Sequence, residues 1–259
     1  AGSGFGTNFR ITTWGETHGA GVGVVVDGCP AGLPLEREDV QKYLDRRKPG
    51  QSKYTTQRKE GDQVEILSGI FEGRTTGTPI SMVVYNKDQR SKDYSNIKDI
   101  YRPGHADFTF DMKYGFRDYR GGGRSSGRET IGRVAAGAVA AKVLKELGIE
   151  IKAYAKAIAG IEVSKDHFDF AEMNNNPFNM PDKEAAKLVQ EKADQMIKEM
   201  DSIGGIIECQ IKGMPVGIGE TVFDKLDAEL SKAIMSIGSV KGFEIGDGFE
   251  AANLRGSEN

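Results

Sequence analysis

Apolar residues recur along the chain at two spacings, and the spacing separates the expected strands from the expected helices. Alternation of apolar and polar positions is typical of half-buried strands, whereas recurrence every three or four residues indicates a helix with one buried face. Strands are predicted at 9–14, 21–27, 64–71, 79–85 and 205–212, with one or two more between 148 and 163. Helices are predicted from residue 37, over 131–147, from a cap at Asp182 to about 200, and from about residue 222.

One strand–turn–helix order occurs twice with nearly the same turn. The sequence G-C-P-A-G-L at 28–33 follows one predicted strand, and G-M-P-V-G-I at 213–218 follows another. Pro-Gly turns are common enough for a coincidence, but the matching flanks favour an internal duplication. These elements predict an α+β fold, a sandwich of β-sheets and helices with an internally duplicated strand–turn–helix unit.

The stretch at 102–130 concentrates the candidate chemistry. His105 stands in a Pro-Gly turn, and three glycines at 121–123 run into an arginine. Ser126 followed by Glu129 ahead of an apolar run is a capping box, so a helix is predicted to begin at Ser126. Glycines before a helix start leave backbone N–H groups for an anion. The pattern indicates a phosphate or carboxylate site, with a tight loop and solvated arginines as the alternative.

A second candidate is His18, in the turn G-E-T-H-G at 15–19 between two predicted strands. Loops at strand ends commonly display catalytic groups, and imidazole titrates near neutrality. A histidine in a turn is also often only a surface residue. The pattern alone leaves both interpretations open.

Composition limits the classes of function. The 259 residues have a net charge of −3, which gives no general affinity for nucleic acid, although 46–59 carries six basic side chains and no acidic one. Cys29 and Cys209 lack a zinc-binding spacing, so no metal is expected, and two thiols suit a reducing cytoplasm. The chain has no run of about 18 apolar residues, so no membrane span is predicted. Its start lacks the regions of a signal peptide.

Five motifs make the chain resemble the chorismate synthase family from about Phe5 to its last residue. They are G-E-T-H-G at 15–19, D-R-R-K-P-G at 45–50, R-P-G-H-A-D at 102–107, R-S-S-G-R-E-T at 124–130 and G-F-E-I-G-D-G-F at 242–249. The resemblance implies a lyase of the shikimate pathway of aromatic amino acid biosynthesis. In its reaction, 5-enolpyruvylshikimate 3-phosphate loses phosphate by an anti-1,4-elimination to give chorismate. Reduced FMN (FMNH2) is the implied cofactor, and some members also use NADPH to reduce the flavin.

The resemblance also implies roles for individual residues. His18 and His105 match the family's acid positions, the first to protonate the departing phosphate and the second near the flavin. Basic side chains match the substrate-binding positions: Arg47, Lys53, Arg58, Arg102 and Arg128. Flavin-binding positions are matched by Arg124, Ser125, Ser126, Gly238 and Ser239. The substrate carries a phosphate and two carboxylates, and guanidinium groups suit such oxyanions because they bind them bidentately.

The chain departs from the family pattern at several places. Lys53 stands where the family often has Arg, Thr17 replaces the commoner Ser beside the histidine, and Gly238-Ser239 differs from the usual pair. The family continues with a further segment that carries flavin contacts and an aspartate implicated in removing the substrate proton. The resemblance therefore implies a single domain over 1–259 whose C-terminal part is missing.

The resemblance further implies a homotetramer in the cytoplasm that acts on a small molecule, without nucleic acid or membrane partners. Two other functions remain as alternatives. One is an NAD(P)H-dependent flavin reductase, and the other is a non-enzymatic RNA-binding protein whose basic loops hold phosphates. Against RNA binding, the chain has neither an RRM-like aromatic motif nor a KH-type G-x-x-G element.

Overall fold

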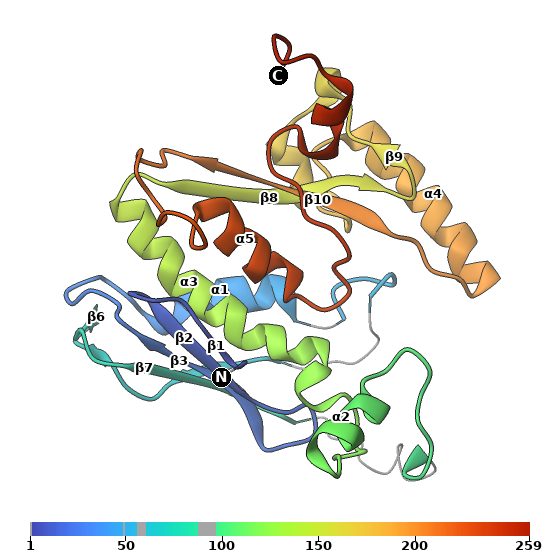
Figure 1. Cartoon of the computed structure of the whole chain (residues 1–259). Coiled ribbons are helices and arrows are strands. Elements are labelled where there is room, and N and C mark those ends of the chain that lie inside the picture. The colour runs from blue at the N-terminus through green and yellow to red at the C-terminus, as the bar shows by residue number, and fades with distance from the viewer. Residues whose placement is uncertain (1, 49, 56–60, 88–96) are drawn as a thin grey trace. The chain divides into compact units, whose positions relative to one another are not determined.

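The computed structural model describes residues 2–48, 50–55, 61–87 and 97–259 (Figure 1). The chain divides into two compact units. The first unit comprises 1–45, 62–140 and 215–259, and the second comprises 46–61 and 141–214. The single domain expected over 1–259 stays a prediction. None of the described helices combines the length and the apolar character needed to cross a membrane.

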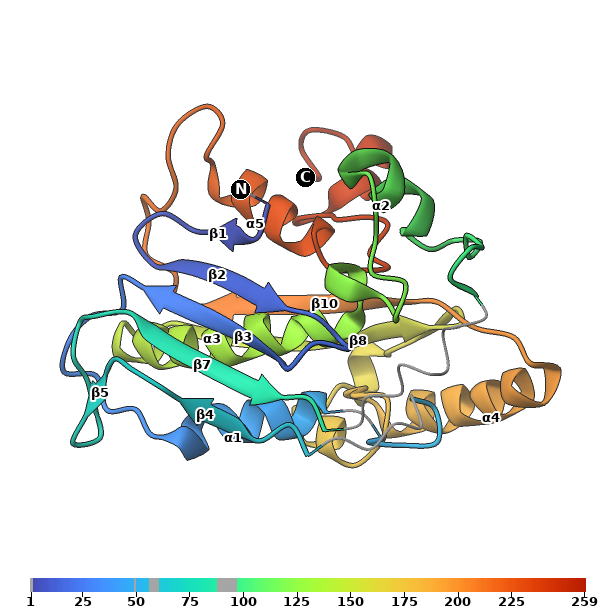
Figure 2. The same ribbon diagram turned by 90° about the horizontal axis from the view of Figure 1, so that it is seen from below.

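The first unit is built on an antiparallel sheet with the strand order β1-β2-β3-β7-β4 (Figure 2). Its strands are β1 (Gly4–Phe5), β2 (Arg10–Gly15), β3 (Gly21–Asp27), β7 (Ile80–Tyr85) and β4 (Val64–Ile66). Val24, on the central strand, lies opposite Thr13 of β2 and Met82 of β7. A separate two-stranded sheet pairs β5 (Ile70–Phe71) with β6 (Arg74–Thr75).

The first unit also contains helices. They are α1 (Arg37–Arg47), α2 (Asp107–Tyr114), the start of α3 (Thr130–Glu146) and α5 (Leu226–Met235). In α1, Val40 and Leu44 are fully buried, and Gln41 accepts a hydrogen bond from the Val64 N–H at 2.9 Å. A Cβ at Gly132 of α3 would lie 2.9 Å from Thr13 Cγ2, so the glycine lets the helix approach β2 closely.

The second unit has its own sheet, in the order β10-β8-β9, and its own core. The elements are β8 (Glu150–Ile158), β9 (Ile161–Glu162), α4 (Lys183–Glu199) and β10 (Gly205–Lys212). Asp182 caps α4 by accepting hydrogen bonds from the N–H groups of Glu184 and Ala185. Met180 and Val189 are fully buried in the core cluster. Short 3-10 turns complete the chain: Gly123–Ser125, Gly127–Glu129, Lys165–His167, Phe170–Asn174 and Gly248–Asn253.

Most predicted elements are confirmed, and two predictions outside the stretch at 102–130 are wrong. The strand expected at 64–71 is two strands, because the chain turns at Gly69, where φ is +80°. The helix expected from about 222 begins only at Leu226, since Val222 has a left-handed φ of 71°. The segment at 166–180 lies at the surface as expected, with two 3-10 turns, except that Met180 at its end is buried.

The two similar turns after β3 and β10 share one steric requirement. At Gly28, φ is +92° and a Cβ would lie 1.8 Å from the carbonyl oxygen of Asn8. At Gly213, φ is +79° and a Cβ would lie 2.2 Å from the carbonyl oxygen of Gly148. Asn8 lies two residues before the start of β2, and Gly148 lies two residues before the start of β8. The duplication itself stays a prediction.

Candidate functional site

The turn between β2 and β3 places His18 inside the first unit. His18 is only 5% exposed, so it is not a surface residue. Gly15 allows the turn because its φ is +90° and a Cβ there would lie 2.1 Å from the carbonyl oxygen of Gly21. Asn86, just after β7, holds the turn by donating from Nδ2 to the carbonyl oxygens of Glu16 at 2.9 Å and Gly19 at 2.8 Å.

Asn86 also connects this turn to Arg128, one of the predicted substrate-binding residues. Arg128 donates from Nε to Asn86 Oδ1 at 2.6 Å and from Nη1 to Asp62 Oδ1 at 2.9 Å. The side chain of Asp62 is fully buried and that of Arg128 is 8% exposed. A buried guanidinium held by a carboxylate and an amide has a fixed position, because breaking either contact leaves a buried polar group unsatisfied.

His105 belongs to a second network, centred on Asp107. Arg102 binds Asp107 bidentately, from Nε to Oδ2 and from Nη2 to Oδ1, both at 2.8 Å. His105 Nδ1 lies 2.9 Å from Asp107 Oδ1. Arg117 Nε lies 3.5 Å from the same oxygen. The Arg102 guanidinium holds the pKa of the Asp107 carboxyl well below its usual range, so this carboxylate is ionised at neutral pH.

Gly121 links the two networks. Its carbonyl oxygen accepts a hydrogen bond from Arg102 Nη2 at 2.9 Å. Its φ is +110°, and a Cβ at this position would lie 2.4 Å from Cδ2 of His18. The backbone of the glycine loop therefore packs directly against the His18 ring, and Arg102, which binds Asp107, holds it there.

The helix predicted to begin at Ser126 begins instead at Thr130, after a 3-10 turn. Ser126 does cap this turn, because its Oγ accepts a hydrogen bond from the Arg128 N–H at 3.2 Å. The reciprocal half of the capping box is missing. Glu129 instead accepts hydrogen bonds from Thr13 Oγ1 at 2.8 Å and from Arg133 Nε at 2.9 Å. A long-range pairing with β2 and α3 thus replaces the local bond that the motif predicts.

The predicted flavin-binding residues come from two segments that meet at the start of α3. Arg124 is anchored to β2, where Nη2 donates to the carbonyl oxygen of Thr13 at 3.0 Å and to Thr13 Oγ1 at 2.7 Å. Arg133 of α3 donates from Nη1 to Ser236 Oγ at 2.7 Å, which ties the chain just before Gly238 and Ser239 to the same helix. Hydroxyls, a guanidinium and open backbone next to Gly238 form a donor set that fits a phosphate-bearing cofactor.

Two of the predicted substrate-binding residues that the structure describes, Arg47 and Lys53, belong to the second unit. Arg47 ends α1, and Lys53 pairs with Asp194 at 2.8 Å. Asp194, which also accepts a hydrogen bond from Tyr54, raises the pKa of the exposed Lys53. Arg58 lies outside the described residues.

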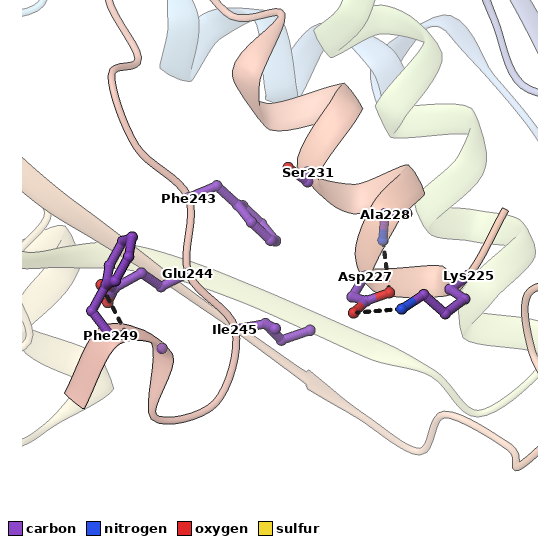
Figure 3. Close-up of a pocket in the computed structure, with 9 residues that line it drawn as sticks. Lys225, Asp227, Ala228, Ser231, Phe243, Glu244, Ile245 and Phe249 are labelled. Atoms are coloured by element: carbon purple, nitrogen blue, oxygen red, sulfur yellow. Dashed lines mark hydrogen bonds and ion pairs between the residues drawn. The ribbon is translucent and has the colours of Figure 1, made fainter. Parts of the chain in front are cut away.

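One cavity of the first unit is lined by a different set of residues (Figure 3). Its volume is about 480 Å³, and it opens between α5 and the segment at 243–249. Phe243, Ile245 and Phe249 contribute apolar lining, and Asp227 pairs with Lys225 at its edge. The motif at 242–249 therefore builds a pocket wall, while none of the predicted catalytic or anion-binding side chains that the structure describes lines it.

Sequence reasoning missed the residues that hold the candidate site in place. Asp107 ends the motif at 102–107, but the motif resemblance implies a role only for Arg102 and His105 of this motif. Asn86 and Asp62 carry no sequence signal, because their partners are more than 40 positions away in the chain. A burial pattern identifies core positions, but it does not reveal which buried polar groups will meet.

Comparisons with known proteins agree with the motifs. The chorismate synthase family model matches residues 9–259. A chorismate synthase of Lachnospira eligens is 70% identical over 259 residues, which covers 100% of this chain and 71% of that relative. One from Agathobacter rectalis is 63% identical with the same coverage. A crystal structure of chorismate synthase matches with a TM-score of 0.80 at 33% identity, covering 97% of this chain and 72% of the other. This likeness and the mixed helices and antiparallel sheets confirm the predicted α+β class.

Proposed function

The chain belongs to the chorismate synthase family, and on that premise we propose how its own residues carry out the reaction. The reaction eliminates phosphate from 5-enolpyruvylshikimate 3-phosphate and gives chorismate, and the family requires a reduced flavin. The alternatives of a flavin reductase and an RNA-binding protein gain no support from the comparisons. The observation that carries the site proposal is the single glycine, Gly121, that joins the His18 turn to the His105 cluster.

We assign His18 to the protonation of the departing phosphate. Its burial supports this role, because an imidazolium in a site with little water interacts strongly with a phosphate dianion. The Asn86 hydrogen bonds to both sides of the turn support it too, because a general acid must be held within hydrogen-bond reach of the atom that it protonates. His105 is assigned as the second acid, next to the flavin.

Substrate anions are proposed to bind to Arg47, Lys53, Arg58, Arg102 and Arg128. Arg128 has the best-supported place among them, because its contacts with Asp62 and Asn86 fix the guanidinium before substrate arrives. The ammonium group of Lys53 is a point charge and cannot bind an oxyanion bidentately as a guanidinium does. It therefore discriminates less between oxyanion geometries than an arginine would.

The reduced flavin is proposed to be held by Arg124, Ser125 and Ser126 together with Gly238 and Ser239. When bound, reduced FMN supplies electron density to the allylic system of the substrate and recovers it. The chain's part is to bind and orient the phosphate of the cofactor with hydroxyls, backbone N–H groups and a guanidinium that β2 holds in place.

Three further features of the family are proposed for this chain. Association into a homotetramer is supported by the exposed apolar side chains of α2, Phe108 and Met112, which are 53% and 70% exposed. A cytoplasmic location is supported by two free cysteines. NADPH-driven reduction of the flavin rests on the resemblance alone.

An anaerobic assay tests the proposed function. The full-length protein, supplied with reduced FMN and 5-enolpyruvylshikimate 3-phosphate, should release phosphate and chorismate in equal amounts. FMN fluorescence should show tighter binding when substrate is present, because arginines near one helix start serve both anions. Equal FMN affinity with and without substrate would contradict a shared anion site.

A further inference from the structure

The Nδ1 atom of His105 lies between a carboxylate and a guanidinium, and it can bond to only one of them at a time. It is 2.9 Å from Asp107 Oδ1 and 3.2 Å from Arg102 Nη2. If Nδ1 carries no hydrogen, it accepts a hydrogen bond from Arg102. If it carries one, it donates to Asp107. The choice determines which nitrogen of the neutral ring can take up a proton.

The hydrogens of Arg102 decide between these two arrangements. A terminal guanidinium nitrogen has two N–H groups. Nη2 of Arg102 donates to Asp107 Oδ1 at 2.8 Å and to the carbonyl oxygen of Gly121 at 2.9 Å, which uses both. No hydrogen of Nη2 remains for His105, so Nδ1 must carry its own hydrogen and donate it to Asp107.

Asp107 is suited to accept this bond. Its side chain is 4% exposed, and its second oxygen, Oδ2, accepts from Arg102 Nε at 2.8 Å and from the Arg102 backbone N–H at 3.1 Å. These contacts fix the carboxylate in orientation. They also keep it ionised, because each donor favours the charged form.

We propose that Asp107 is a positioning residue for the reaction. It holds the neutral His105 ring with its hydrogen on Nδ1, so that Nε2 is the nitrogen that exchanges a proton with the site. When Nε2 is protonated, the same carboxylate stabilises the imidazolium. A carboxylate that orients a histidine in this way is well known from hydrolytic triads, where it sets the tautomer without itself taking the proton. The proposal rests on the proposed role of His105 as an acid.

Nitrogen NMR of the protein labelled with ¹⁵N-histidine tests the tautomer directly. The chain has three histidines, so single His→Ala variants assign each ring. For the neutral His105 ring we expect the hydrogen on Nδ1 and the acceptor resonance on Nε2. A wild-type His105 with its hydrogen on Nε2 would overturn the proposal, and this measurement requires neither a variant of Asp107 nor turnover.

Two variants extend the test to function. Asp107→Asn should move the hydrogen to Nε2 and lower kcat by about 10²–10⁴ with a much smaller change in KM. Asp111→Asn is the matched control, because Asp111 lies one turn further along α2, pairs with Arg117 at 3.0 Å and, within the described residues, forms no hydrogen bond or ion pair with His105. It should leave both the tautomer and the turnover unchanged.

A background lacking His105 separates positioning from a structural effect. In His105→Ala protein, Asp107→Asn should cost no further activity, because the two residues act as one unit. An equal loss in both backgrounds would overturn the proposal. Full turnover of His105→Ala alone would remove the acid role and the positioning role together. If His105→Ala is inactive but the neutral His105 ring of the wild-type protein carries its hydrogen on Nε2, the positioning role of Asp107 is wrong and the proposed function still stands.

Discussion

Replacing Asn86 by alanine removes the side chain that holds the His18 turn. Three hydrogen bonds are lost: two donated to the carbonyls of Glu16 and Gly19, and one accepted from Arg128 at 2.6 Å. A neutral hydrogen bond contributes about 0.5–1.5 kcal/mol and one to a charged group about 1.5–3 kcal/mol. These contacts are partly exposed, so water can form hydrogen bonds with the groups that lose their partner. We therefore expect the free energy of unfolding to fall by about 2–4 kcal/mol.

The assay combines thermal unfolding with turnover. For a chain of this size, 1 kcal/mol shifts Tm by about 2–4 °C, so Asn86→Ala should melt at least about 4 °C lower. Turnover should fall by about 10²-fold, since a displacement of about 1 Å at a reacting group has an effect of that size. Asn253→Ala, which removes an exposed asparagine paired with Glu250, is the control and should change neither value.

Asn86→Asp separates the two functions of this side chain. The carboxylate still accepts from Arg128, but it faces two carbonyl oxygens to which Asn86 donated. We therefore expect turnover to fall as it does in Asn86→Ala while the arginine contact is kept. If both variants retain wild-type turnover and stability, the inference that Asn86 positions His18 is refuted.

Three other perturbations probe the same site. Gly121→Ala should slow turnover strongly, because the new methyl would lie 2.4 Å from the His18 ring; an active variant with an undisplaced ring in its crystal structure would contradict this. Ser126→Ala should lose about 0.5–2 kcal/mol of stability with its cap to the Arg128 N–H, measured by urea unfolding, and an unchanged midpoint would exclude the cap. The pKa of Asp107 is lowered in the folded protein, so the stability that it contributes is present above the unfolded value of about 3.9 and is lost as pH falls below it. Asp107→Asn should therefore flatten the acid limb of the stability profile, and an unchanged limb would contradict the assignment.

The sequence predicts local elements well because their signals are local. The strands at 21–27 and 205–212 and the helix capped by Asp182 are found where the pattern places them. The errors arise where a turn depends on the backbone of another segment. At Gly69, φ is +80° and a Cβ would lie 2.8 Å from the carbonyl oxygen of Pro79, and this close approach is not encoded in the apolar pattern around Gly69.

The sequence predicts the reactive and anion-binding residues of the candidate site, but it does not predict the residues that hold them in position. Motif resemblance selects His18, His105 and the arginines. It does not show that Glu129 accepts a hydrogen bond from Thr13 instead of completing the capping box. Nor does it show that Asn86 joins the His18 turn to Arg128. These pairings bring together residues that are distant in sequence, and only the folded sheet makes them neighbours.

Measuring single-turnover phosphate release by His18→Ala tests the central assignment most directly. The full-length protein is mixed anaerobically with reduced FMN and 5-enolpyruvylshikimate 3-phosphate, and substrate affinity is measured separately. His167→Ala is the control, because His167 is half-exposed and has no role in the proposal. If His18 protonates the leaving phosphate, its loss lowers the rate by about 10²–10⁴ and leaves substrate affinity nearly unchanged. A wild-type rate in His18→Ala would contradict the assignment.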